Sequence, residues 1–195
     1  MNKTPKDKRY LMLATASIPR SFFVNSLKTV GVEAEVLWEQ DDQFASFEAP
    51  ARIAPLLDDL MRDMHDDLGF QLVLLAVHQR TSFEEKLLQN ALRFLPNRCC
   101  FPTDVIMREL SFGDFSSFAG LMKLFKDVHT DLLMTVGMYL RCGLDACLSA
   151  RKLAIHRNTF NYRLNAFVEK TGLDIRDYHN ALLLELYFAL GGGRS

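Results

Sequence analysis

The spacing of hydrophobic positions divides the chain into two parts of different character. Up to about residue 106, short apolar runs that suit buried strands alternate with segments whose apolar positions recur every three or four residues. The predicted strands cover 9–15, 33–39, 44–48, 70–78 and a last short stretch within 99–106, and the predicted helices cover 19–30, 50–68 and 82–95. From about Phe112 onward every segment has a helical pattern. The pattern predicts an α+β domain over residues 1–110, followed by an all-α domain over residues 111–195.

The predicted elements of the first domain follow the order β-α-β-β-α-β-α, and a strand within 99–106 would close it. This is the order of a ferredoxin-like α+β sandwich. The second and third strands flank Asp41-Asp42, which predicts a hairpin. Ser82 is predicted to cap the third helix, with Glu85 completing a capping box.

Residues 150–164 predict a helix, a tight turn and a second helix. Small Ala150 would let two helices cross closely, and Leu153 and Ile155 would anchor the turn. The second helix, expected over about 157–170, has one apolar stripe, formed by Phe160, Leu164, Phe167 and Val168. Its opposite face carries Asn158, Tyr162, Asn165 and Glu169, with Asn161 and Arg163 on the flanks. Amide, phenol and guanidinium groups can hydrogen-bond to base edges and phosphates, so the pattern is typical of a DNA-recognition helix.

The charges are distributed unevenly along a chain whose overall net charge is −1. Residues 141–170 carry six basic and two acidic side chains, whereas residues 1–130 carry fifteen basic and eighteen acidic ones. A local basic patch on a nearly neutral chain favours contact with phosphate. One alternative stays open, because a polar helix face is often only solvated. The fold could then serve as a protein-interaction or ligand-sensor module without sequence-specific DNA binding.

Residues 131–190 resemble the C-terminal domain of PucR-type transcriptional regulators, a group that includes the sugar-diacid regulators. The motifs that carry the resemblance are His156-Arg157-Asn158-Thr159, Tyr162-Arg163-Leu164 and Thr171-Gly172-Leu173-Asp174. The resemblance implies binding of double-stranded DNA by the second helix, a homodimer, a small-molecule effector and control of a metabolic operon. The DNA-binding positions that it implies are His156, Arg157, Asn158, Thr159, Asn161, Tyr162 and Arg163.

The element order of the first domain also resembles the degenerate cyclase-type, or GGDEF-like, domain of these regulators. In the enzymatic version the hairpin reads Gly-Gly-Asp-Glu-Phe, where the glycines let the backbone approach phosphates and the acids hold a metal ion. Here the hairpin reads Gln40-Asp41-Asp42-Gln43-Phe44, so both glycines are missing and a glutamine replaces the glutamate. We therefore expect no cyclase activity, and no other motif in the chain predicts an enzyme.

The remaining chemical candidates favour structural roles, and we expect no metal ion and no cofactor. The spacing of Cys99, Cys100, Cys142 and Cys147 does not match a zinc site. The aspartates of the helix 50–68 lie along a single helix, where carboxylates do not surround an ion. No serine has a Gly-x-Ser-x-Gly context.

Two further expectations concern apolar segments. No apolar run approaches 18 residues, and only the short Leu11–Ala14 run follows the basic N-terminus, so we expect no membrane span and a cytoplasmic location. Residues 178–190 are apolar almost all round, which predicts a helix at the centre of the C-terminal bundle with part of it at a dimer seam.

Overall fold

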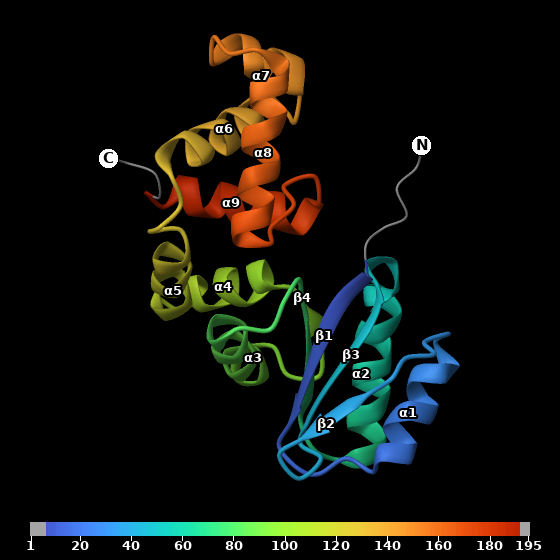
Figure 1. Cartoon of the computed structure of the whole chain (residues 1–195). Coiled ribbons are helices and arrows are strands. Elements are labelled where there is room, and N and C mark those ends of the chain that lie inside the picture. The colour runs from blue at the N-terminus through green and yellow to red at the C-terminus, as the bar shows by residue number, and fades with distance from the viewer. Residues whose placement is uncertain (1–6, 192–195) are drawn as a thin grey trace. The chain divides into compact units, whose positions relative to one another are not determined.

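The computed structural model describes residues 7–191 and divides into two compact units, one ending at Ser117 and the other beginning at Phe118 (Figure 1). The sequence analysis placed the domain boundary slightly earlier, between residues 110 and 111. The first unit is α+β with a mixed sheet, and the second is helical.

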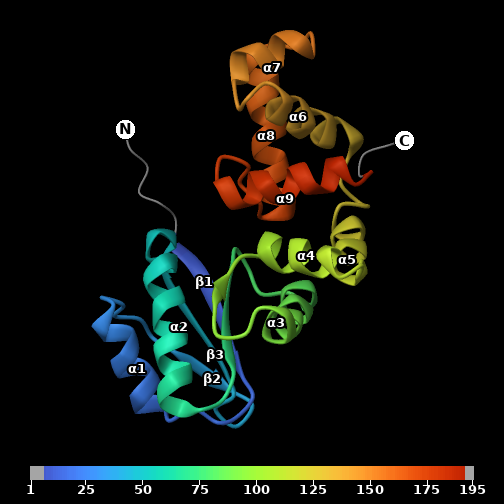
Figure 2. The same cartoon turned by 180° about the vertical axis from the view of Figure 1, so that it is seen from behind.

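The first unit is built on a five-stranded sheet with the order β2-β3-β1-β4-β5. Its elements are β1 Asp7–Ala14, α1 Arg20–Thr29, β2 Leu37–Glu39, β3 Phe44–Pro50, a 3-10 turn Ala51–Ile53, α2 Ala54–Leu68, β4 Leu72–Val77, α3 Ser82–Phe94, β5 Cys99–Cys100 and α4 Pro102–Ser111. β1 lies at the centre, antiparallel to β3 and β4, so that Leu11 faces Ser46 on one side and Leu75 on the other. β4 and β5 are parallel. Helices α1 and α2 cover one face of the sheet and α3 packs on the other (Figure 2).

The observed order agrees with the predicted β-α-β-β-α-β-α series, and β5 adds the closing strand. The assignment to a ferredoxin-like or cyclase-type fold stays a prediction. The main core lies between the sheet and the helices α1 and α2, where Tyr10 stacks on Phe47 and the edge of Phe23 meets Phe47.

The predicted strand over 33–39 is shorter than expected, because only Leu37–Glu39 pairs with β3. The preceding segment leaves the ladder, yet Val32 is buried and Ala34 and Val36 pack against the core. Alternating burial therefore produced a strand-like pattern without strand pairing.

The last short strand, predicted within 99–106, is limited to two residues, and most of this stretch is helical. Only Cys99 and Cys100 pair with β4, and α4 begins at Pro102. Proline is well suited to the first turn of a helix, where no backbone donor is needed. The Asp104 carboxylate accepts a hydrogen bond from the Phe101 N–H at 2.8 Å and so closes the start of the helix.

The predicted cap of α3 is wrong by one residue. The N-cap is Thr81, whose hydroxyl accepts a hydrogen bond from the Phe83 N–H at 3.2 Å and also bonds to Glu84. Neighbouring Thr-Ser and Glu-Glu pairs offer two equally spaced capping boxes, and the sequence pattern alone did not separate them.

Several of the chemical candidates have structural roles. Asp58 accepts hydrogen bonds from Arg98 Nε at 2.7 Å and from the Cys99 N–H at 2.9 Å, which joins α2 to β5. Burial raises the pKa of the Cys99 and Cys100 thiols. Within residues 7–191, no group of three or more His, Cys, Asp or Glu side chains could hold a metal ion. No helix in the same range is long and apolar enough to cross a membrane.

The second unit is a bundle of helices. These are α5 Ser116–Leu124, which begins just before the unit boundary, α6 Thr130–Arg141, α7 Ala146–Lys152, α8 Arg157–Thr171 and α9 Tyr178–Ala189. The Phe125 ring lies 6.1 Å from that of Phe167 and 4.7 Å from that of Tyr187, which joins α8 and α9 in one core. Phe188 lies directly against Gly137 of α6, where a Cβ atom would be 3.4 Å from the ring. The apolar helix α9 is thus packed within the bundle, as predicted.

Candidate nucleic-acid interface

Helices α7 and α8 form a helix-turn-helix pair, which both views show at one end of the second unit (Figures 1 and 2). Asp145 caps α7, because its Oδ1 accepts hydrogen bonds from the N–H groups of Cys147 at 2.8 Å and Leu148 at 2.9 Å. Ala150 is buried where the helices approach, as the sequence indicated. Helices α7 and α8 pack directly against each other.

The turn between the helices depends on one residue in the left-handed region. Ala154 has a φ of 54°. Its N–H donates to the Arg151 carbonyl at 3.1 Å, and the Ile155 N–H reaches the Ala150 carbonyl at 3.0 Å. A side chain with a Cβ atom is disfavoured in this conformation.

Replacing Ala154 with glycine should therefore stabilise the second unit. The left-handed conformation costs a residue with a Cβ about 1–2 kcal/mol, and the greater freedom of glycine in the unfolded chain offsets about 0.5–1 kcal/mol of the gain. We expect a net increase of about 0.5–1 kcal/mol in the free energy of unfolding, measured by urea denaturation. The matched control is Ala166→Gly in the middle of α8, which should lose about 1 kcal/mol. Equal losses from both variants would contradict the strain assigned to the turn.

The apolar stripe of α8 faces the bundle as predicted. Phe160 and Phe167 are completely buried, Leu164 is nearly so, and Val168 is half-buried. The Phe160 ring meets the edge of Tyr139 of α6 at a centroid distance of 5.5 Å. This packing sets the rotation of α8 about its own axis and decides which side chains point outward.

Six of the seven implied DNA-binding residues are exposed on the N-terminal half of α8 or at its cap: His156, Arg157, Asn158, Thr159, Asn161 and Tyr162. Tyr162 is 73% exposed, which is unusual for so large a side chain. Arg151 and Lys152, at the end of α7, are also exposed, and the sequence analysis counted them only as charge. Within residues 7–191, no carboxylate forms an ion pair with Arg151, Lys152 or Arg157. The surface thus combines hydrogen-bonding groups with unneutralised positive charge.

His156 has a structural task that the sequence analysis did not foresee. It is the N-cap of α8, and its Nδ1 accepts a hydrogen bond from the Asn158 N–H at 3.1 Å. His129 caps α6 in the same way, through the Asp131 N–H at 3.2 Å. An Nδ1 atom that accepts leaves the ring proton on Nε2. One side of the His156 ring is therefore committed to starting the helix.

Substitutions of His156 test its role as the N-cap of α8. His156→Ala removes the cap and should lower the free energy of unfolding by about 1 kcal/mol, whereas His156→Asn supplies a capping oxygen in place of Nδ1 and should retain most of this free energy. The pair is compared by thermal unfolding at neutral pH. If asparagine and alanine destabilise equally, the capping role is wrong.

Arg163 differs from the other implied residues because its side chain is only 26% exposed and is already paired. Its Nη2 donates to Asp131 Oδ2 at 2.9 Å, which ties the middle of α8 to the first turn of α6. The geometry indicates a positioning role for this arginine. No sequence signal identified Asp131, 32 residues earlier, as the partner.

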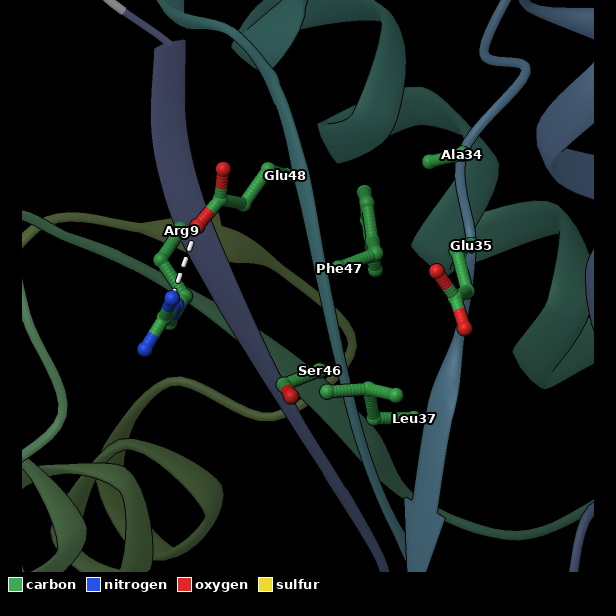
Figure 3. Close-up of a pocket in the computed structure, with 7 residues that line it drawn as sticks. All are labelled: Arg9, Ala34, Glu35, Leu37, Ser46, Phe47 and Glu48. Atoms are coloured by element: carbon green, nitrogen blue, oxygen red, sulfur yellow. Dashed lines mark hydrogen bonds and ion pairs between the residues drawn. The ribbon is translucent and has the colours of Figure 1, made fainter.

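The first unit holds a pocket of about 230 Å³ beside β3 (Figure 3). Its lining residues are Arg9, Ala34, Glu35, Leu37, Ser46, Phe47 and Glu48. The pocket opens where the segment before β2 diverges from β3. Arg9 is paired with Glu48 at 2.7 Å, and Glu35 adds a second carboxylate, so the lining does not favour an anionic ligand.

The hairpin compared with a cyclase motif has an unusual backbone. Gln40, Asp41 and Asp42 all have positive φ angles. The loop is held to the start of α1 by Arg20 Nε, which donates to Asp42 Oδ1 at 2.8 Å. It is held to the β1–α1 connection by the Ser17 hydroxyl, which donates to the Asp41 carbonyl at 2.6 Å. Asp42, the residue aligned with the metal-holding acids, is thus engaged by an arginine.

Comparison with known protein families bears directly on the helix-turn-helix pair. Residues 132–190 match the PucR C-terminal helix-turn-helix domain. The PucR-type domain therefore comprises almost all of α6 together with α7, α8 and α9, and its second helix is the one with the exposed polar face.

Individual relatives agree over part of the chain. The carbohydrate diacid regulator of Escherichia coli is 41% identical over 105 residues, which cover 50% of this chain and 27% of that protein. The uncharacterized protein YxkF of Bacillus subtilis is 37% identical over 55 residues, covering 28% of this chain and 18% of YxkF. The chain thus spans about a fifth to a quarter of the length of these relatives. A solved structure, a regulator of polyketide synthase expression from Bifidobacterium adolescentis, aligns with 95% of this chain and 80% of that one at a TM-score of 0.45 and 19% identity.

Proposed function

We propose that this chain binds double-stranded DNA through α8 and acts as a transcriptional regulator of the PucR type. The observation that carries the proposal is the exposed polar and basic row on the N-terminal half of α8, within a domain that matches the PucR helix-turn-helix. In this mode the N-terminal residues of the second helix meet base edges in the major groove. Asn158, Asn161 and Tyr162 would face bases, and Arg157 would contact a guanine or a phosphate.

The charge at the start of α8 supports a binding role. The first turn contains Arg157 and no acidic residue. A cation near a helix N-terminus opposes the helix dipole and makes the helix slightly less stable. Helix stability alone does not favour an arginine at this position, whereas contact with a DNA phosphate would favour it.

The wider regulatory role belongs to the same proposal. The E. coli relative is named a carbohydrate diacid regulator, and we extend regulation of a metabolic operon, a small-molecule effector and a cytoplasmic location to this chain. We also propose a homodimer, which would present two copies of α8 to half-sites about one helical turn, or roughly 34 Å, apart.

The proposal is tested by selecting bound sequences from a random duplex pool with the whole chain. We expect one enriched motif, and a dimer should make it palindromic. Binding to the selected duplex should fall steeply with salt, with a log–log slope of about −0.9 for each phosphate neutralised. Selection that enriches no motif, or binding that salt does not weaken, would favour the protein-interaction or ligand-sensor alternative.

We further propose that the first unit has no cyclase activity. The substituted hairpin and the pairing of Asp42 with Arg20 support this. Incubation with nucleoside triphosphates and Mg²⁺ should give no turnover. Turnover that Asp42→Ala abolishes would contradict the proposal.

A further inference from the structure

Helices α3 and α4 of the first unit pack together (Figure 2). At their C-terminal ends, aromatic and arginine side chains form an exposed stack. We call it the Arg–Phe stack and define it as Arg93, Phe94, Arg108 and Phe112. The rings of Phe94 and Phe112 are stacked at a centroid distance of 5.7 Å. The Arg93 guanidinium lies 4.8 Å from the Phe94 centroid, and that of Arg108 lies 4.9 Å from the Phe112 centroid. Phe112 is 63% exposed.

Hydrogen bonds hold the C-terminal end of α4 against α3. The buried Glu109 carboxylate accepts hydrogen bonds from the Ser117 hydroxyl at 2.7 Å and from its N–H at 3.2 Å. Asn90 of α3 donates to the same Ser117 hydroxyl at 3.0 Å. These bonds fix the end of α4 against α3, so the backbone that carries the stack does not need to be ordered when a partner binds.

The two guanidinium groups are not neutralised within the part of the chain that the structure describes. No carboxylate in residues 7–191 forms an ion pair with Arg93 or Arg108. Asp114 lies within electrostatic range of Arg93, but its Oδ1 accepts a hydrogen bond from the Ser116 N–H at 2.9 Å. An exposed aromatic surface flanked by arginines has the composition of a protein–protein hot spot.

We propose that the Arg–Phe stack is a docking site for an acidic segment of another protein, with carboxylates that pair with Arg93 and Arg108 and an apolar side chain that covers Phe112. We choose an acidic partner because its charge is complementary to that of the two arginines, and arginine binds planar carboxylates in bidentate geometry. A second copy seated stack against stack would bring guanidinium groups together. Single-stranded nucleic acid is disfavoured because bases stack on open ring faces, whereas each ring here already has a ring and a guanidinium against it. An apolar side chain needs no open ring face to contact the exposed part of Phe112.

The proposal does not depend on DNA binding and is tested without DNA. The probe is a fluorescently labelled peptide of about 15 residues, or roughly four helical turns, composed of Glu, Leu, Phe and Ala; its control has every Glu replaced by Gln. Anisotropy with the whole chain should show salt-sensitive binding of the Glu peptide and binding of the Gln peptide weaker by about tenfold. The double variant R93Q/R108Q and the variant Phe112→Ser should each weaken binding of the Glu peptide by about tenfold. Arg52→Gln, which removes an exposed arginine elsewhere in the same unit, should change it by less than about twofold.

Four outcomes would overturn the proposal. These are no binding of the Glu peptide, equal binding of the Glu and Gln peptides, equal losses from Arg52→Gln and R93Q/R108Q, and self-association that Phe112→Ser abolishes. The last would assign the stack to a second copy. Circular dichroism confirms that each variant is folded before binding is compared.

Discussion

Replacing Phe160 with alanine is expected to lower the free energy of unfolding of the second unit by about 3–5 kcal/mol. The ring is completely buried and packs edge-on against Tyr139 of α6. Its loss removes a large apolar surface and leaves a cavity that the surrounding helices cannot fill without moving. Because the same ring fixes the rotation of α8, the variant should also lose duplex binding.

The single tryptophan makes this prediction specific to one unit. Trp38 lies in the first unit and packs edge-on against Phe23 at 5.5 Å. Urea unfolding followed by tryptophan fluorescence reports on the first unit, whereas far-ultraviolet circular dichroism reports on both. Phe160→Ala should shift the helical transition of the second unit and leave the Trp38 transition in place. Tyr162→Ala, on the exposed face of the same helix, should change stability by less than about 0.5 kcal/mol. A Phe160 variant as stable as the Tyr162 variant would contradict the packing assigned to α8.

The sequence predicted α8 well because local rules and tertiary packing agree there. The apolar positions recur at helical spacing from Phe160 to Val168, over about two and a half turns, and one face must be buried for the helix to be stable. The observed helix, Arg157–Thr171, accordingly differs by one residue at its end from the predicted range, and three of the four predicted stripe residues are buried. The fourth, Val168, is half-buried, and Thr171 is buried in addition. The exposed residues follow from the same geometry.

The sequence failed where two local solutions were equivalent or where a distant residue decides the outcome. The segment 33–36 alternates like a strand, but burial of one side requires only an extended backbone. The segment diverges from β3 although β3 continues to Pro50. The pairing of Arg163 with Asp131 was not predicted, because Asp131 belongs to a different helix and comes close only after the bundle has formed. Residues that serve as DNA contacts and residues that position them are both polar, and only their partners distinguish them.

Arg157→Ala is the variant that tests the interface most directly. We expect it to weaken binding to the selected duplex by about 1–3 kcal/mol, or roughly 5- to 160-fold, because the guanidinium is exposed and has no partner carboxylate in the described chain. Its stability should be unchanged or slightly raised, since the substitution removes a cation from the positive end of the helix dipole. Affinity is measured by fluorescence anisotropy across a series of salt concentrations, and stability by urea denaturation.

The salt series also identifies what Arg157 contacts. If it contacts a phosphate, the salt slope should fall by about one and all sequences should be weakened alike; if it contacts a guanine, specificity at one position should relax. Arg52→Ala, an equal change of charge at an exposed site in the first unit, should leave both affinity and salt slope unchanged. Equal binding by wild type and Arg157→Ala at low salt would remove Arg157 from the interface. Loss of binding together with loss of stability would instead make it a structural residue, contrary to the dipole argument.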